Sequence, residues 1–233
     1  MGKLCFPIAL TMIVFLTASA GTQPVRTWLG IDVLREGVPA SQTRVQIYAQ
    51  NIDKVRCSLY HIAPEQFLQY VTNRQYYLGY AFSHETSRLR RALPEPKGTL
   101  VKEWQSQLTA RGGREGRDAH YSRVVFLPEV QSGIYYLRVS AGEKWQGQFV
   151  MVSRMGCVAK FGADGVLLYT YDYEKGQPLP NVQLTLFDQR RQPFQEARTG
   201  HDGIARLSAS EVRGASALLA RRGEDVLFHY LSD

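Results

Sequence analysis

The chain has 233 residues, 44% of them hydrophobic, and a formal net charge of +7. No heptad pattern and no transmembrane candidate follows the first twenty residues, which argues against a coiled coil and a helical membrane protein. The length is too great for one β-sandwich and suits two, because such domains run to about 100 residues each.

Residues 1–20 have the pattern of a secretory signal. Lys3 gives a positive start, Leu4 to Leu16 is mostly apolar, and Ala18-Ser19-Ala20 is a small-x-small cleavage pattern. The apolar run is well short of the roughly 20 residues that span a bilayer, so a membrane anchor is the weaker interpretation. We expect cleavage after Ala20 and a periplasmic or secreted protein.

A first domain is predicted over residues 24–153. Its clearest strand is RVQIYAQ at 44–50, where Val45, Ile47 and Ala49 fall on one face. Pro64 suits the first position of a short helix, within a helical insertion at about 64–92. Further strands are expected at 55–62, 99–109, 121–127, 134–140 and 145–152.

Positive charge is concentrated in residues 88–123, which contain nine Lys or Arg against four Asp or Glu. Prolines and glycines interrupt this segment, and the stretch 110–120 is polar and rich in glycine, so we expect solvated loops. Contact of these basic loops with an anionic cell envelope is a second interpretation. Export argues against a nucleic-acid partner.

A second domain is predicted over residues 154–233. Val182, Leu184 and Leu186 alternate with other residues at the period of a half-buried strand, and Asp202-Gly203 predicts a tight hairpin. Seven short strands with turns between them make a complete sandwich. They are expected at 157–161, 166–173, 182–188, 194–199, 204–208, 216–222 and 226–231.

The motifs of common enzymes are missing from the sequence. It contains no HExxH helix, no phosphate-binding Gly-Lys-Ser/Thr loop, no CxxC and no GxGxxG, and residues 214–218 lack the second glycine of a nucleophile elbow. We therefore predict no enzyme, no catalytic, cofactor-binding or metal-binding residues and no cofactor. Five histidines are scattered without metal-ligand spacing: His61, His84, His120, His201 and His229. The sequence His201-Asp202-Gly203 is interpreted as a turn.

Two kinds of side chain leave alternatives open. Cys57 and Cys157 are interpreted as separate buried thiols, with a disulfide as the alternative that export permits. Trp104 and Trp145, with the tyrosines at 76, 77 and 80, are interpreted as packing residues, with a sugar-binding surface as the alternative.

Four segments together suggest a family. GIYYL at 133–137, VAK at 158–160, GQPLPNVQLTLFD at 176–188 and RTGHDGIARL at 198–207 resemble the N-terminal macroglobulin domains of bacterial alpha-2-macroglobulins. Asn181 departs from the pattern, since a small residue is usual there. The resemblance implies an all-β fold of two fibronectin- or immunoglobulin-like antiparallel sandwiches, which we expect to pack end to end.

The resemblance implies a large exported endopeptidase inhibitor of the protease-trap type. In this type, proteases are bound by the full-length protein. Its thioester motif is Cys-Gly-x-Gln, whereas Val158 and Ala159 follow Cys157, and no bait segment is identifiable. We therefore predict a non-catalytic scaffold region of such an inhibitor. The alternative is a carbohydrate- or cell-surface-binding sandwich module.

Overall fold

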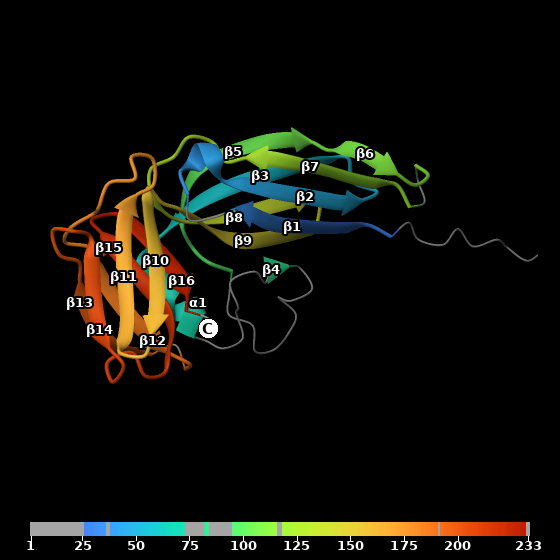
Figure 1. Ribbon diagram of the computed structural model, residues 1–233. Helices are drawn as coiled ribbons and strands as arrows, with labels where there is room; N and C mark the ends of the chain where they lie inside the picture. The colour runs from blue at the N-terminus through green and yellow to red at the C-terminus, as the bar shows by residue number, and fades with distance from the viewer. Residues whose placement is uncertain are drawn as a thin grey trace, which may run out of the picture.

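The computed structural model describes residues 26–35, 38–72, 82–83, 95–115, 118–190 and 192–231. The predicted secretory signal, residues 1–20, lies outside the described residues. The strands form four antiparallel sheets that pair into two sandwiches (Figure 1). This confirms the predicted all-β class. Among the described helices, none has the length and apolarity that a membrane crossing requires.

The first sandwich consists of a four-stranded and a five-stranded sheet, here sheet A and sheet B. Sheet A has the order β1 (Trp28–Arg35), β2 (Arg44–Gln50), β7 (His120–Phe126) and β6 (Thr109–Gly112). Sheet B has the order β4 (Phe82–Ser83), β9 (Lys144–Val152), β8 (Gly133–Ala141), β3 (Lys54–Ile62) and β5 (Thr99–Gln107). A 3-10 turn, η1 (Ala40–Gln42), precedes β2.

Alternation along the strands creates the first core. In β2, Val45, Ile47 and Ala49 point inward and are buried, as the sequence predicts. Leu59 of β3 and Leu137 of β8 face them from sheet B. Burial of apolar side chains from both sheets is the main stabilising term in such a sandwich.

The second sandwich contains the seven strands that were predicted, divided between a three-stranded sheet C and a four-stranded sheet D. Sheet C has the order β10 (Met155–Gly162), β11 (Gly165–Asp172) and β14 (Ile204–Ser208). Sheet D has the order β13 (Pro193–Arg198), β12 (Gln183–Asp188), β15 (Ala215–Arg222) and β16 (Asp225–Tyr230). The predicted alternation in β12 holds, because Leu184 and Leu186 point into the core between these sheets.

The predicted hairpin at Asp202-Gly203 is wrong, although the turn itself is present. Gly203 has a φ of 71°, and the Gly200 amide donates to the Ile204 carbonyl across the turn. The turn joins β13 of sheet D to β14 of sheet C, so the two strands belong to different sheets. The Thr170 amide of β11 donates to the Gly203 carbonyl, which fixes the turn against sheet C.

Two strands of sheet A were not predicted. β1 carries Leu29, Ile31 and Val33 on its inner face, an alternation that the prediction did not use. β6 occupies the start of the stretch 110–120 that was interpreted as a loop, and all four of its residues are exposed. Exposure of both faces explains why this short edge strand has no apolar pattern.

A third apolar cluster joins the two sandwiches, here called the interface core. Its centre is α1 (Pro64–Thr72), which begins at the predicted proline and buries Phe67 and Tyr70. Figure 1 shows α1 next to β16. The outer faces of sheets B and D supply the rest of the cluster: Ile62, Ile134, Tyr136, Phe149, Met151, Phe187, Ala217, Leu219, Val226 and Phe228.

The interface core changes the predicted arrangement of the sandwiches. Contact is made by the faces of sheets B and D with α1 between them, rather than by the loops at the sandwich ends. Glu65 of α1 adds an ion pair to Arg221 of β15 at 3.5 Å. Of the predicted insertion at 64–92, residues 73–81 and 84–92 lie outside the described residues.

Candidate functional site

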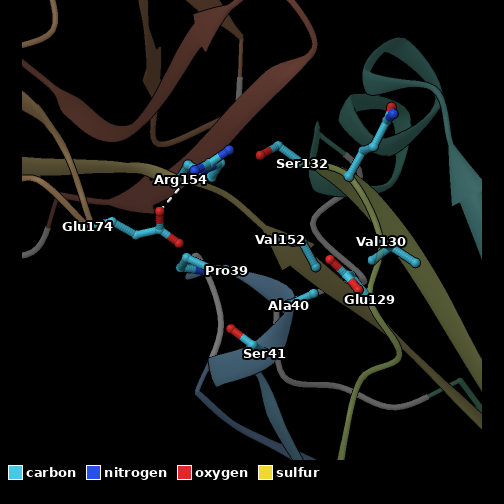
Figure 2. Close-up of a pocket in the computed structure, with 10 residues that line it drawn as sticks. Pro39, Ala40, Ser41, Glu129, Val130, Ser132, Val152, Arg154 and Glu174 are labelled. Carbon is cyan, nitrogen blue, oxygen red and sulfur yellow. Dashed lines mark hydrogen bonds and ion pairs between the residues drawn. The ribbon is translucent and has the colours of Figure 1, made fainter.

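The candidate site is a pocket of about 780 Å³ at the junction of the two sandwiches, here called the junction pocket. Figure 2 shows Arg154 and Glu174 on one side, with Glu129 and Val130 on the other. The pocket is lined from η1, the turn before β8, the linker after β9 and the turn after β11: Pro39, Ala40, Ser41, Glu129, Val130, Gln131, Ser132, Val152, Arg154 and Glu174.

Ser153 ties the linker to both sandwiches. Its amide donates to the Val38 carbonyl of the first sandwich at 3.2 Å. Its hydroxyl donates to Oδ1 of Asp225 in the second sandwich at 2.7 Å and accepts the Met155 amide at 3.0 Å. Ser153 is fully buried, and these bonds satisfy polar groups that burial would otherwise penalise.

Arg154 continues this set of contacts on the open side of the linker. Its guanidinium donates to Oε2 of Glu174 at 2.8 Å, and its carbonyl accepts the Tyr173 amide at 2.7 Å. The bond to Glu174 raises the pKa of the exposed guanidinium. Asp172 shapes the same turn by accepting the amides of Lys175 and Glu174, and these bonds lower the pKa of its carboxyl group.

Asp225 is the acceptor at which the sandwiches meet. Besides the Ser153 hydroxyl, it receives the Arg154 amide at 3.2 Å and the side chain of Ser132, which lies in the first sandwich. Burial raises the pKa of the Asp225 carboxyl group, and the hydrogen bonds from Ser153, Arg154 and Ser132 oppose that rise. The carboxyl group therefore connects the turn before β8, the linker and the β15–β16 hairpin.

The chemistry of the junction pocket is that of a structural joint. Arg154 and Glu174 form an ion pair, and the pocket walls provide no cysteine or histidine. The Ser132 hydroxyl is hydrogen-bonded to Asp225, but that carboxyl group also accepts the Ser153 hydroxyl and the Arg154 amide and is thereby held in the joint. In the described part of the chain, no three His, Cys, Asp or Glu side chains lie close enough together to hold a metal ion.

The histidines that were considered as ligands are dispersed over the fold. His61 lies on β3 with its ring edge-on to Tyr135 at 5.4 Å, and His120 and His229 lie on β7 and β16. His201 lies in the turn before β14. His84 falls outside the described residues.

Two further motifs turn out to be structural. In the His201-Asp202-Gly203 turn, Asp202 accepts the Ile204 amide at 3.1 Å, as expected of a turn residue. Ser216 of the 214–218 segment lies on β15, and its hydroxyl donates to the Asp188 carbonyl at 2.6 Å.

Cys57 and Cys157 are free thiols, which confirms the first of the two interpretations. Cys57 belongs to the first core, where burial raises the pKa of its thiol to about 12. Cys157 packs beside the second core, where burial raises the thiol pKa to about 11. High thiol pKa values oppose formation of the nucleophilic thiolate.

In the part of the chain that the structure describes, the two tryptophans considered for sugar binding lie on different surfaces. Trp104 packs against the first core, whereas Trp145 packs against the interface core on the other face of sheet B. The tyrosines at 76, 77 and 80 lie outside the described residues.

Sequence reasoning missed the residues that build the junction. Ser153 and Asp225 are 72 positions apart, and neither lies in a motif that signals the other. Glu174 and its ion-pair partner Arg154 are 20 positions apart, and no motif links them. Only the turn after β11 could have been predicted locally, because Asp is a common turn residue whose side chain accepts nearby backbone amides. Here Asp172 accepts the amides of Glu174 and Lys175.

Comparison with known proteins places this arrangement in context. Residues 152–233 match the family model described as the bacterial alpha-2-macroglobulin MG3 domain. No curated protein sequence matches the chain. The predicted resemblance to bacterial macroglobulin domains is confirmed by the family match and by the structural neighbours.

Three solved structures of Escherichia coli alpha-2-macroglobulin share the fold. A fragment spanning domains NIE-MG1 has 16% identity and a TM-score of 0.61, with 87% of this chain and 97% of the fragment covered. A longer fragment, MG0-NIE-MG1, has 15% identity and a TM-score of 0.62, with coverage of 88% and 64%. The trypsin-activated protein has 17% identity and a TM-score of 0.55, with coverage of 88% and 14%.

The chain thus spans less than two thirds of the three-domain fragment and a small part of the trypsin-activated inhibitor.

Proposed function

Because residues 152–233 match a bacterial macroglobulin domain, we propose that the chain is a non-catalytic scaffold region of an exported, alpha-2-macroglobulin-like endopeptidase inhibitor. The observation that carries this proposal is the interface core. It joins a macroglobulin domain to a preceding sandwich in an arrangement that covers nearly all of the E. coli NIE-MG1 fragment. In this proposal, protease binding and capture belong to the full-length protein.

The geometry of the joint supports a scaffold role. A trap that changes shape after cleavage needs units that move as rigid bodies, and packed apolar interfaces make such units. Here the interface core, the Asp225 contacts and the Glu65–Arg221 ion pair all connect the same two sandwiches. We infer that the described region moves as one piece.

The limits of the two domains remain part of the proposal. We propose residues 24–153 and 154–233, because the core of the first sandwich ends at Val152 and that of the second begins at Met155. Ser153 and Arg154 form the linker. Removal of residues 1–20 and a periplasmic or secreted location are proposed from the sequence pattern of the leader.

Co-incubation with proteases tests the scaffold role. Purified chain is incubated with trypsin and with elastase, and their activity is then measured on a casein substrate and on a short chromogenic peptide. We expect unchanged activity on both substrates and no covalent adduct on a denaturing gel. Inhibition of casein cleavage by this chain alone, or an adduct at Cys157, would contradict the proposal.

Assignment to an inhibitor requires a second measurement on the full gene product. Its sequence is expected to contain a bait segment and a Cys-Gly-x-Gln motif. The full-length protein should protect casein from trypsin but leave cleavage of the small peptide largely unaffected. A gene product that leaves casein cleavage unchanged would refute the inhibitor assignment and leave only the fold relationship.

A further inference from the structure

The outer face of sheet B is divided into an apolar half and a polar half. The apolar half lies in the interface core and includes Ile62 and Tyr60 of β3. Because side chains alternate along a strand, Ser58, Arg56 and Lys54 continue along this same face beyond the interface core. A cationic surface therefore borders the joint between the sandwiches.

Strand register brings complementary side chains together in this polar half. Arg56 of β3 pairs with Gln105 of β5 on one side and with Ser140 of β8 on the other. Arg138 of β8 is diagonal to Arg56, and such diagonal neighbours on one face lie about 7–8 Å apart. Lys54 lies two positions before Arg56 on the same face.

These residues line a pocket of about 490 Å³, here called the basic pocket: Lys54, Val55, Arg56, Gln105, Arg138, Ser140 and Gly142. Its charged lining residues are all cations, and Gln105 and Ser140 add an amide and a hydroxyl donor. None of them belongs to the junction pocket, and the three cations lie outside the basic segment 88–123.

Arg138 is held in place before any ligand arrives. Its guanidinium lies over the Trp145 ring at 5.0 Å from the centroid, and its Nε is 3.0 Å from Oε1 of Glu95. The aromatic contact restricts the planar group without using all of its N–H donors. An arginine fixed in this way loses less conformational entropy when it binds an anion.

Lys54 and Arg56 are exposed, and within the described ranges neither forms an ion pair. Two carboxylates border the pocket: that of Glu95 pairs with Arg138, and that of Glu103 on β5 accepts the Ser58 hydroxyl at 3.0 Å. Two unpaired cations beside a fixed arginine repel one another, so the pocket has a structural reason to attract negative charge.

We propose that the basic pocket binds a phosphate-class oxyanion, held by the guanidinium groups of Arg56 and Arg138 and the ammonium group of Lys54. Guanidinium forks match the oxygens of a phosphate, and Lys adds a point charge. The phosphate group could belong to a soluble ligand or to a lipid headgroup, since both present the same oxygens on a shallow, open site. The inference goes beyond the scaffold role and does not depend on it.

The test measures binding of two probes at low and high salt. Inorganic pyrophosphate is titrated by isothermal calorimetry. Binding to phosphatidylcholine vesicles, with or without phosphatidylglycerol, is measured by co-sedimentation. The test variant is Lys54→Gln/Arg56→Gln, and the control is Lys160→Gln/Lys175→Gln, which removes the same charge from exposed positions of the second sandwich. Circular dichroism verifies that both variants are folded.

Saturable pyrophosphate binding that weakens with salt is expected, with a rise in Kd of about tenfold or more in the test variant and little change in the control. Vesicle binding that needs phosphatidylglycerol and is displaced by pyrophosphate would assign the group to a lipid, and its absence would assign it to a soluble ligand. No saturable pyrophosphate binding, or equal losses in both variants, would overturn the proposal.

Discussion

Phe67 is the residue on which the joint between the sandwiches depends most, and Phe67→Ala is the sharpest test of that joint. Its side chain is fully buried, and its ring meets Phe149 of the first sandwich at 5.1 Å and Phe228 of the second at 5.7 Å. Both contacts are edge-on, a favoured geometry for aromatic pairs. Truncation to alanine would leave a cavity between two sheets that are held by their own cores.

The expected loss is about 3–5 kcal/mol of unfolding free energy, the usual range for a buried phenylalanine. That loss should fall on the coupling between the sandwiches, because Phe67 belongs to neither sandwich core. The wild-type chain should then unfold in one transition, and the variant in two.

Urea unfolding followed by two signals can separate the sandwiches. All three tryptophans, Trp28, Trp104 and Trp145, lie on strands of the first sandwich, so their fluorescence reports that sandwich. Trp145 also packs against the interface core and adds a signal from the joint. Far-UV circular dichroism reports strands of both. The two curves should coincide for the wild type and for the control Lys160→Ala at an exposed position, and should differ for Phe67→Ala.

The reasoning would be refuted by coincident curves in Phe67→Ala together with a stability loss within about 0.5 kcal/mol, the range of ordinary surface substitutions. Coincident curves with the full loss would instead place Phe67 in the folding of the whole chain, and the coupling argument would again be wrong.

Three further predictions follow from single sites. Gly203→Ala should lower Tm more than the control Gly176→Ala. Both glycines have left-handed φ values, 71° and 67°, a conformation that costs a residue with a side chain about 1–2 kcal/mol. At Gly203 the added Cβ would also lie 2.5 Å from the Thr170 carbonyl oxygen, whereas at Gly176 it would meet no atom within 4 Å. Because burial raises the pKa of Asp225, its contribution to stability should fall as pH rises above the ordinary aspartate range, and urea unfolding at several pH values should show a flatter profile for Asp225→Asn. With thiol pKa values of about 12 and 11, Cys57 and Cys157 should label slowly with a thiol reagent at pH 7 in the native chain and fully in guanidinium, and fast native labelling of either would contradict their burial.

Periodicity was enough to predict most strands, because alternation in a strand depends only on which face is buried. The strand at 44–50 was predicted at its observed bounds, and the start of the helix was predicted from Pro64. The Asp202-Gly203 turn shows the limit of local chemistry. A glycine at positive φ permits a tight turn, but whether the next strand pairs with the last depends on which sheet offers a free edge.

The contacts at the junction could not be derived in the same way. Asp225 lies two positions after Gly223 in an ordinary hairpin, and nothing nearby indicates that its carboxyl group will contact Ser153. Such contacts depend on how two complete sandwiches are placed relative to each other. Hydrogen bonds and ion pairs between residues far apart in the sequence are determined by that placement, so a local sequence pattern cannot predict them.

The interface core can be recognised in the sequence, because the strands that contribute to it do not alternate between apolar and polar residues. In β8, Gly133 to Leu137 are buried without a break. Tyr135 and Leu137 face the first core, whereas Ile134 and Tyr136 face the interface core. β15 has the same property, since Leu218 faces the second core and Leu219 the interface. A continuous apolar run in an antiparallel strand indicates cover on both faces. The GIYYL segment that suggested a family therefore has a physical reason in this chain, because its strand is held between one sandwich core and the joint to the next.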